Sequence, residues 1–253
     1  MDFSIPKQRN LFLEVHRDLP REGPGNQDST ARALVLAGRL PVAPSLLDIA
    51  CGPGMQTIHL AELLPDATIT AVDLNKSMTV ETRRRVAAAG MSARIVVEIG
   101  DMTSLTYPDA AFDLIWCEGA AYNMGVERAI RTWKRMLKPV GIIALTDAVW
   151  LKQDPPEDLA EFWAAYPDMN NVESRRQMIE ECGYELKGDF ILPETAWWDD
   201  YYLPMKSRLQ TLAVKYKDDG EAMSVVNDCK AEIAFYEQYA DYYGYVFLVM
   251  SRL

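Results

Sequence analysis

The chain has 253 residues, of which 49% are hydrophobic and 25% are charged, an ordinary balance for a globular protein. Its net charge of −11 opposes binding to a nucleic-acid backbone, and no stretch is long and apolar enough to cross a bilayer. At this length, one α/β domain with an elaboration is favoured over two independent domains.

The cysteines and histidines also exclude several kinds of site. The four cysteines show no C-x-x-C spacing, and only His16 and His59 are available to join them in a metal site. We therefore expect no metal and no disulfide framework. The start, Met1-Asp2-Phe3-Ser4, lacks the basic and apolar regions of a signal peptide, which predicts a cytoplasmic protein without a membrane partner. The run Arg83-Arg84-Arg85 is interpreted as the solvated face of a helix.

The first segment predicts a helical arm. Residues 6–19 carry an amphipathic pattern that Gly23-Pro24-Gly25 ends, because glycine and proline cannot continue a helix. A second helix is expected to begin at a cap on Asp28 or Ser29 and to run to Leu40. The arm is either a packing segment or a cover over a ligand site.

From residue 45 to residue 150, apolar strands alternate with helical stretches. The predicted strands are 46–50, 68–73, 94–98, 112–117 and 142–150, and the predicted helices are 55–64, 77–89 and 126–137. Strands joined by helical crossovers run parallel, with helices on both faces of the sheet. Two further helices, 157–166 and 171–182, precede a sixth strand at 184–192, and 244–250 predicts a seventh.

The first strand leads into a glycine turn, Ala50-Cys51-Gly52-Pro53-Gly54. Because Gly52 and Gly54 lack a Cβ, a ligand can approach the backbone, and the helix that follows offers unpaired N–H groups. The second strand ends at Asp73, where a carboxylate can accept both hydroxyls of a ribose.

Two families share this arrangement. The dinucleotide fingerprint needs a third glycine, but the chain from Gly52 onward reads Gly-Pro-Gly-Met-Gln-Thr. An acid, Asp48, instead precedes the turn. The stretch from Asp48 to Gly54 resembles the first motif of the class I S-adenosylmethionine (SAM)-dependent methyltransferases, an acid, one residue and G-x-G-x-G, with Ala50 at the first glycine. The chain is similar to uncharacterised bacterial members that have an N-terminal Gly-Pro-Gly arm.

This resemblance implies an α/β fold and a division of the chain. The expected fold is a Rossmann-like seven-stranded sheet, mostly parallel with the last strand antiparallel, with helices on both faces and a helical insertion before the last strand. The single methyltransferase domain then comprises an N-terminal helical arm (1–44), a SAM-binding core (45–192), a helical insertion or lid (193–243) and the final strand (244–253).

The resemblance also implies SAM as the cofactor and S-adenosyl-L-homocysteine (SAH) as its product. Asp48 is expected to hold the methionine ammonium, Asp73 the ribose and Asp101 the exocyclic amine of adenine. The complete set of expected cofactor-binding residues is Asp48, Ala50, Gly52, Gly54, Asp73, Leu74, Asp101, Met102 and Glu118.

The acceptor side is less defined. Glu118, after the fourth strand, is expected either to contact the methionine amine or to deprotonate the acceptor, with His16 as a second candidate base if the arm folds over the site. His59 is interpreted as structural. Aromatic residues stand at both ends of the insertion, where they would flank the active edge of the sheet. The expected substrate-side residues are Tyr122, Asn123, Trp197, Tyr202 and Tyr243.

We therefore predict a SAM-dependent methyltransferase that transfers a methyl group to a nitrogen or oxygen nucleophile of a small molecule by in-line displacement. An NAD-dependent oxidoreductase and a non-catalytic SAM-binding protein are the alternatives. The expected partner is a small-molecule acceptor, with no nucleic acid and no membrane, and a homodimer is left open. The sequence does not choose among N-, O- and C-methylation.

Overall fold

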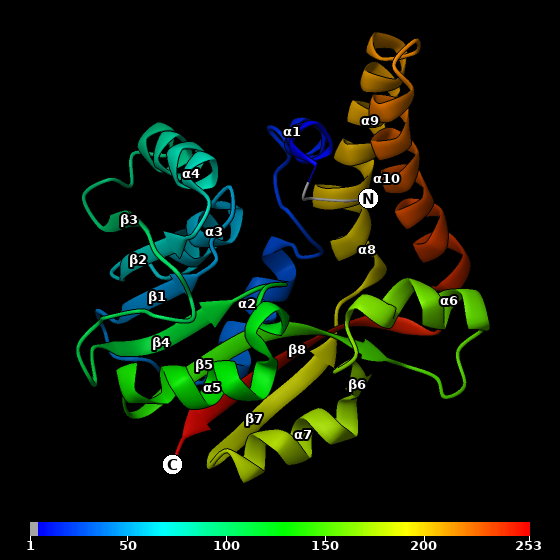
Figure 1. Ribbon diagram of the computed structural model, residues 1–253. Coiled ribbons are helices and arrows are strands. Elements are labelled where there is room, and N and C mark those ends of the chain that lie inside the picture. Colours follow the sequence, from blue (N-terminus) through cyan, green and yellow to red (C-terminus); the bar gives the residue numbers. More distant parts are fainter. Residues whose placement is uncertain (1–4) are drawn as a thin grey trace.

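The computed structural model describes residues 5–253 (Figure 1). Residues 1–4, on which the signal-peptide prediction depends, lie outside this range. Within it, no helix combines the length and the apolar composition that a membrane span needs.

The strands form one mixed sheet in the order β3-β2-β1-β4-β5-β8-β7. β8 is antiparallel to both of its neighbours, and the remaining pairs in this series are parallel. The predicted fold class is thus confirmed. The strands are β1 (Ser45–Ile49), β2 (Thr68–Asp73), β3 (Ile95–Ile99), β4 (Phe112–Cys117), β5 (Leu137–Trp150), β7 (Tyr184–Ile191) and β8 (Tyr243–Arg252). A two-residue strand, β6 (Asn170–Asn171), pairs with the end of β5 and was not predicted.

Helices cover both faces of the sheet, as predicted (Figure 1). Because successive side chains of a strand point to opposite faces, Leu46 packs in one buried cluster and Leu47 in another. The Leu46 cluster includes residues of α2 (Gln27–Ala37), α3 (Met55–Leu63) and α4 (Lys76–Ala88). The Leu47 cluster includes residues of α5 (Val126–Trp133) and α7 (Val172–Glu181).

Several helix boundaries differ from the predicted ones, among them the start of α2 and the end of α5. α2 is capped by Asn26, whose side chain accepts a 2.9 Å hydrogen bond from the Ser29 N–H, so the predicted cap at Asp28 or Ser29 is wrong. The helix predicted over 126–137 ends at Trp133 and continues as a 3₁₀ turn, η2 (Lys134–Met136). It stops there because β5 begins at Leu137.

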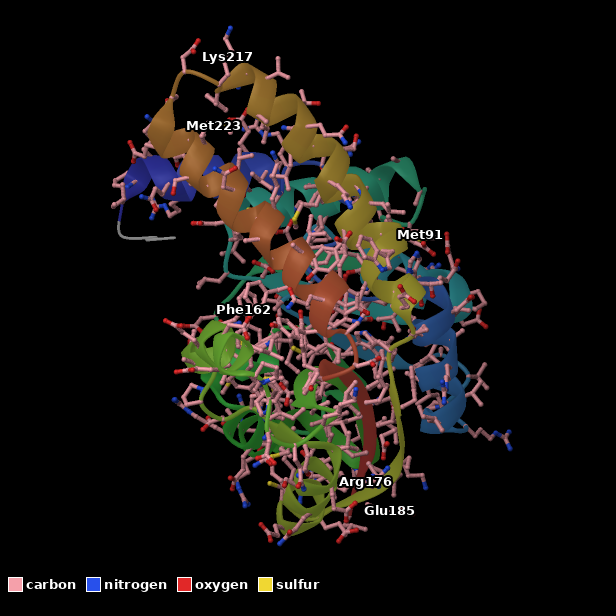
Figure 2. The ribbon with its side chains drawn as sticks, turned by 90° about the vertical axis from the view of Figure 1, so that its right-hand side faces the viewer. Met91, Phe162, Arg176, Glu185, Lys217 and Met223 are labelled. Atoms are coloured by element: carbon pink, nitrogen blue, oxygen red, sulfur yellow. The ribbon has the colours of Figure 1, made fainter. Side chains whose placement is uncertain are left out.

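The arm and the insertion share a third buried cluster, beyond the carboxyl edge of the sheet. In Figure 1, α9 and α10 form a long pair that rises away from the sheet, with α1 beside them. Figure 2 shows Lys217 at the tip of this pair and Arg176 and Glu185 at the opposite end of the molecule. The elements are α1 (Pro6–Val15), α6 (Glu157–Phe162), η3 (Trp163–Ala165), α8 (Glu194–Trp197), a π-helical turn η4 (Trp198–Tyr202), α9 (Leu203–Lys215) and α10 (Gly220–Tyr239).

The three arginines of α4 are not simply a solvated face. Arg85 donates hydrogen bonds to the carbonyls of Leu19 (2.8 Å) and Pro20 (3.0 Å) in the arm. Arg83 donates to the carbonyl of Val97 at 2.7 Å although it is exposed, as is Arg84. Long guanidinium side chains lie along the surface and satisfy free carbonyls, a contact that helical periodicity does not reveal. Arg85 ties the arm to the core.

Candidate active site

The carboxyl ends of the parallel strands meet at one edge of the sheet, and β8 begins at the same edge because Tyr243 pairs with Trp150. Three adjoining cavities lie along it. The first and second share Ala50, Asp73 and Ala120 as lining residues. The first and third share Glu22, Gly23, Pro24, Gly119 and Phe12. The cavities therefore form a continuous series over the strand ends.

The glycine turn forms one wall of the first cavity, which has a volume of about 250 Å³. Gly52 lines it, with a left-handed φ of +52°. Gly54 does not line any of the three cavities. A Cβ on Gly54 would lie 2.5 Å from Thr82 Cγ2, so this glycine allows α4 to pack closely against the turn. The expected role of Gly54 in leaving room for the cofactor is thus not supported by its position.

Ala50, at the first glycine position of the motif, adopts a left-handed φ of +57°. This conformation is normal for glycine and costs an alanine about 1–2 kcal/mol. Ala50 lines both the first and the second cavity, as its expected role requires. The departure from the motif is therefore accommodated with local backbone strain.

Asp48 is a buried carboxylate with one unsatisfied oxygen. Its Oδ2 accepts a hydrogen bond from the Thr57 hydroxyl, whereas no well-aligned donor within residues 5–253 reaches Oδ1. Burial raises the pKa of Asp48 to about 7. An orphaned buried oxygen of this kind suits a cationic ligand group, because a cation would both satisfy the oxygen and favour the ionised carboxylate.

Asp73 stands where the first and second cavities meet. Its Oδ2 accepts the Gly52 N–H at 2.9 Å and its Oδ1 accepts the Asn75 N–H at 2.7 Å. Burial raises the pKa of the carboxyl group. Each carboxylate oxygen has a further lone pair, so these backbone contacts orient Asp73 while leaving it able to accept two hydroxyls.

The second cavity, of about 440 Å³, contains the other residues expected around adenine. Leu74, at 69% exposure, lines it with Met102 and Asp101. Both the N–H and the hydroxyl of Thr103 donate to Asp101 Oδ1 at 2.8 Å, which lowers the pKa of Asp101. Asn123, on the 3₁₀ turn that follows β4, also lines this cavity and not the third one, and its expected place on the acceptor side stays a prediction.

A buried ion pair joins the arm to the end of β4. Arg21 Nη1 lies 2.5 Å from Glu118 Oε2, and the two side chains are 3% and 5% exposed. Trp116 Nε1 donates to Glu118 Oε1 at 2.7 Å. A Cβ on Gly25 would lie 2.5 Å from both members of the pair, so this glycine lets the arm close. Since both oxygens of Glu118 already accept from donors and Glu118 lines the first cavity, its geometry favours a cofactor contact over the role of acceptor base.

His59 supports the same ion pair. Arg21 Nη2 lies 3.1 Å from His59 Nδ1. A guanidinium has no acceptor, so Nδ1 of a neutral His59 accepts this hydrogen bond. Burial lowers the pKa of His59 to about 4, which keeps the ring neutral at physiological pH. Sequence analysis missed Arg21, although an arginine beside the Gly-Pro-Gly turn was a visible signal.

The third cavity, of about 530 Å³, lies between the arm, the sheet and the insertion. Four residues expected on the acceptor side line it, namely Tyr122, Trp197, Tyr202 and Tyr243. Sequence reasoning missed Glu232, whose position in the middle of α10 gives no local signal, and Trp163. Its other aromatic walls are Phe12, Phe162, Tyr166, Tyr201 and Tyr245.

His16 also lines the third cavity, because the arm folds over the site. The side chain is 3% exposed, and its Nδ1 lies 2.9 Å from Glu22 Oε2. The two groups are close but not aligned for a hydrogen bond, and both ring nitrogens of His16 lack an aligned hydrogen-bond partner. Among the described residues, nothing pairs with Nε2 of His16, so this nitrogen is available to a ligand in the cavity.

Comparison with known proteins agrees with this geometry. Residues 46–141 match a family described as a methyltransferase domain. Residues 46–141 therefore resemble a methyltransferase domain, in agreement with the resemblance to the class I SAM-dependent methyltransferases. SAM-dependent methyltransferases from Geobacter sulfurreducens and Thiobacillus denitrificans, both solved with SAH, share its fold. Their TM-scores are both 0.81, at 21% and 22% identity, over 98% and 100% of this chain and 99% and 100% of theirs. The cyclase SpnF has the same fold, with a TM-score of 0.74 and 22% identity over 96% of this chain and 92% of its own.

Relatives found by sequence are also methyltransferases. The 27-O-demethylrifamycin SV methyltransferase of Amycolatopsis mediterranei is 35% identical over 115 residues, 44% of this chain and 42% of that enzyme. Phosphoethanolamine N-methyltransferase 1 of Arabidopsis thaliana is 27% identical over 158 residues, 61% of this chain but 31% of that enzyme. The matches to these two relatives thus span less than half of their length. The methyltransferase-domain match and the shared fold support the family and cofactor predictions.

Proposed function

We propose that this methyltransferase transfers the methyl group of SAM to a nitrogen or oxygen nucleophile of a small molecule. The observation that supports this proposal is the series of three cavities over the strand ends, of which the first two have the residues that SAM needs and the third has room for an acceptor. SAM supplies an activated methyl group, so the protein mainly has to align the acceptor and exclude water.

The chain's own residues account for each part of SAM. Asp101, Met102 and Leu74 would hold the adenine in the second cavity, and Asp73 would accept the ribose hydroxyls. In the first cavity, Ala50 and Gly52 would lie against the methionine part.

The two charges of the methionine part have matching partners nearby. Asp48 Oδ1, buried and unsatisfied, would accept the ammonium group, directly or through water. The Arg21–Glu118 pair offers a cation for the carboxylate and a second anion for the ammonium. In this proposal the arm covers the cofactor, and residues 193–243 act as a lid over the acceptor.

The class of acceptor and the cellular location are also proposals. With a net charge of −11, a nucleic-acid partner is disfavoured, and a small-molecule acceptor in a cytoplasmic location fits the absence of a spanning helix from residues 5–253. A homodimer stays a prediction from the sequence.

One alternative has a specific observation in its favour. Because the SpnF structure is that of a cyclase with this fold, the fold alone does not fix the reaction. In a protein that binds SAM without transferring its methyl group, the residues of the first two cavities would be unchanged. The NAD-dependent oxidoreductase has no such support.

Incubation of the purified protein with methyl-labelled SAM and a metabolite extract tests the proposal. We expect label in a small product and formation of SAH in equal amount. Calorimetry with SAM and with NADH serves as the cofactor control, and SAM should bind more tightly. Binding of SAM without any labelled product would favour the non-catalytic alternative, and tighter binding of NADH would overturn the proposed function.

A further inference from the structure

Glu232 is the acidic side chain that α10 contributes to the third cavity, far along the chain from the cofactor motifs. The hydroxyls of Tyr201 and Tyr202 both donate to its Oε1, at 3.0 and 3.3 Å. Within residues 5–253, no side chain donates to Oε2. Glu232 is thus oriented through one oxygen, while the other is available to a ligand.

The local helix geometry explains how two consecutive tyrosines reach one carboxylate. Tyr201 and Tyr202 lie on the π-helical turn η4, between α8 and α9, and their rings stack at 4.8 Å. Single π-turns within helices are uncommon and often occur at functional sites. The turn directs both hydroxyls toward α10, which fixes Glu232 at the wall of the cavity.

The other walls of this cavity are mostly aromatic, and His16 and Glu22 are the remaining titratable side chains among its described lining residues apart from the tyrosines. Trp197 stacks on Tyr236 at 4.1 Å and on Tyr245 at 5.3 Å, which makes this side rigid. Among the described residues that line the cavity there is no lysine or arginine. Arg175, behind the Tyr166 wall, is already paired with Asp147 at 2.6 Å. An anionic acceptor would therefore find no counter-ion here.

Two polar groups at the same walls have unused hydrogen-bonding capacity. Among residues 5–253, neither ring nitrogen of the buried His16 has an aligned hydrogen-bond partner, and the buried Trp163 Nε1 has none either. His16 lies between Glu22 and the tyrosines, with its ring centroid 6.4 Å from that of Tyr201. These atoms point to a ligand that combines an apolar body with a polar head.

We propose that the third cavity binds a small organic amine as its ammonium ion, with Glu232 as the counter-ion and the aromatic rings around the apolar part, and that this amine is the methyl acceptor. This inference rests on the proposed function. Aromatic faces attract organic cations, and a carboxylate in a site that excludes water adds a charge-assisted hydrogen bond.

Methyl transfer to such an amine begins with the loss of one proton from its nitrogen. The ammonium nitrogen first gives one proton to an unprotonated ring nitrogen of His16, since an ammonium has no lone pair with which to attack. The nitrogen lone pair next forms a bond to the methyl carbon as the carbon–sulfur bond breaks and its electron pair stays on sulfur, which leaves neutral SAH. The product is the N-methyl ammonium ion, which Glu232 again neutralises, and His16 returns its proton to water beside Glu22.

Binding of three probes of similar size tests the site without requiring turnover. Benzylamine is a cation at pH 7.5, benzyl alcohol is its neutral counterpart, and phenylacetate is an anion. We expect tryptophan fluorescence titrations of the wild-type protein to show benzylamine binding at least about tenfold more tightly than benzyl alcohol, and phenylacetate more weakly than both. Equal affinity for the amine and the alcohol would overturn the proposal.

A matched pair of variants on one helix locates the counter-ion. Glu232→Gln should remove the preference for benzylamine over benzyl alcohol while leaving the alcohol's affinity unchanged. Glu237→Gln, whose carboxylate is exposed and paired with Lys206 at 2.9 Å, serves as the control and should keep the preference. A full preference in a folded Glu232→Gln variant would exclude Glu232 as the counter-ion.

Calorimetry with SAM separates this inference from the proposed function. If SAM does not bind but benzylamine is still preferred, the amine site stands and the proposed function fails. If SAM binds and the amine preference is absent, the acceptor inference fails alone. Benzylamine itself, or an aromatic amine in its place, should also gain label from SAM slowly in the wild-type protein and not in Glu232→Gln.

Discussion

The cofactor side and the acceptor side of this site are built in different ways. On the cofactor side, Asp73 and Asp101 are oriented by backbone N–H groups from residues two positions later or from the neighbouring strand end. On the acceptor side, Glu232 is oriented by tyrosine hydroxyls from another helix, and the cavity brings together residues from Phe12 to Tyr245. The first is a local arrangement, and the second depends on long-range packing.

This difference between the two sides indicates which part of the site can change its ligand. A ligand held by strand ends and their turns keeps its site as long as the sheet forms, because the polar groups are part of the backbone geometry. An aromatic cavity under an arm and a helical insertion can change its ligand through side-chain substitutions alone. We expect the family to share SAM and to differ in the acceptor.

The largest effect is expected for Asp73→Ala. The variant should lose about 100-fold or more in SAM affinity, because two charge-assisted hydrogen bonds of roughly 1.5–3 kcal/mol each disappear. Calorimetry measures this, with far-UV circular dichroism as the folding control. Asp101→Ala, at a more exposed strand end, should cost about tenfold or less. Equal losses of SAM affinity in the two variants would show that Asp73 is not the stronger of the two cofactor contacts.

Asp48→Asn should stabilise the protein and weaken SAM binding. The pKa of Asp48 in the folded protein is about 7, against an ordinary value of 3.8, so its burial favours the protonated form. This contribution to stability is fully present below about pH 4 and is lost as the pH rises through 7. The asparagine variant should therefore match the wild type near pH 4 and exceed its free energy of unfolding by about 2–4 kcal/mol at pH 8.

Urea unfolding at the two pH values measures this gain, and calorimetry at pH 8 measures the loss of SAM affinity. A stabilised variant that binds SAM normally would show that the buried carboxylate does not contact the cofactor. An unchanged free energy of unfolding at pH 8 would show that Asp48 is not held in the environment described above.

Arg85→Ala should loosen the arm that the two sides share. It removes two hydrogen bonds to the carbonyls of Leu19 and Pro20, which we expect to cost about 1–3 kcal/mol and a few-fold in SAM affinity. Arg84→Ala is the matched control, because Arg84 pairs with the same Glu81 but does not reach the arm. Thermal unfolding and limited trypsin cleavage after Arg17 or Arg21 measure the effect. Equal behaviour of the two variants would exclude Arg85 as the tether.

The smallest effect is expected for Ala50→Gly. Glycine removes the backbone strain of a left-handed alanine, which raises the free energy of unfolding by about 1–2 kcal/mol. The greater conformational freedom of glycine in the unfolded chain lowers it again by about 0.5–1 kcal/mol. Ala110, at φ +53° on an exposed turn, provides the control Ala110→Gly. Both variants should be stabilised by up to about 1 kcal/mol in urea unfolding. A loss of SAM affinity confined to Ala50→Gly would show that the methyl group contacts the cofactor.

Much of the cofactor side was predictable because its signals are local. Asp48, Ala50 and Gly52 stand within one turn of each other, and Asp73 and Asp101 each follow a recognisable strand. Parallel strands bring such ends to one edge of the sheet whatever the rest of the chain does. The two-residue strand β6 and the cap at Asn26 were missed because short elements carry too few residues for a pattern.

The sequence by itself therefore determined the sheet and the resemblance to the methyltransferase family, and it predicted a place for SAM, since hydrophobic periodicity and a short motif specify them. Tertiary structure alone decided that Arg21 meets Glu118, that Arg85 holds the arm and that Glu232 faces the aromatic cavity. These pairs join residues 97, 66 and 31 positions apart, the last through Tyr201. Contacts of this kind depend on how helices pack and on where long side chains find unsatisfied partners, and neither leaves a periodic signal in the chain.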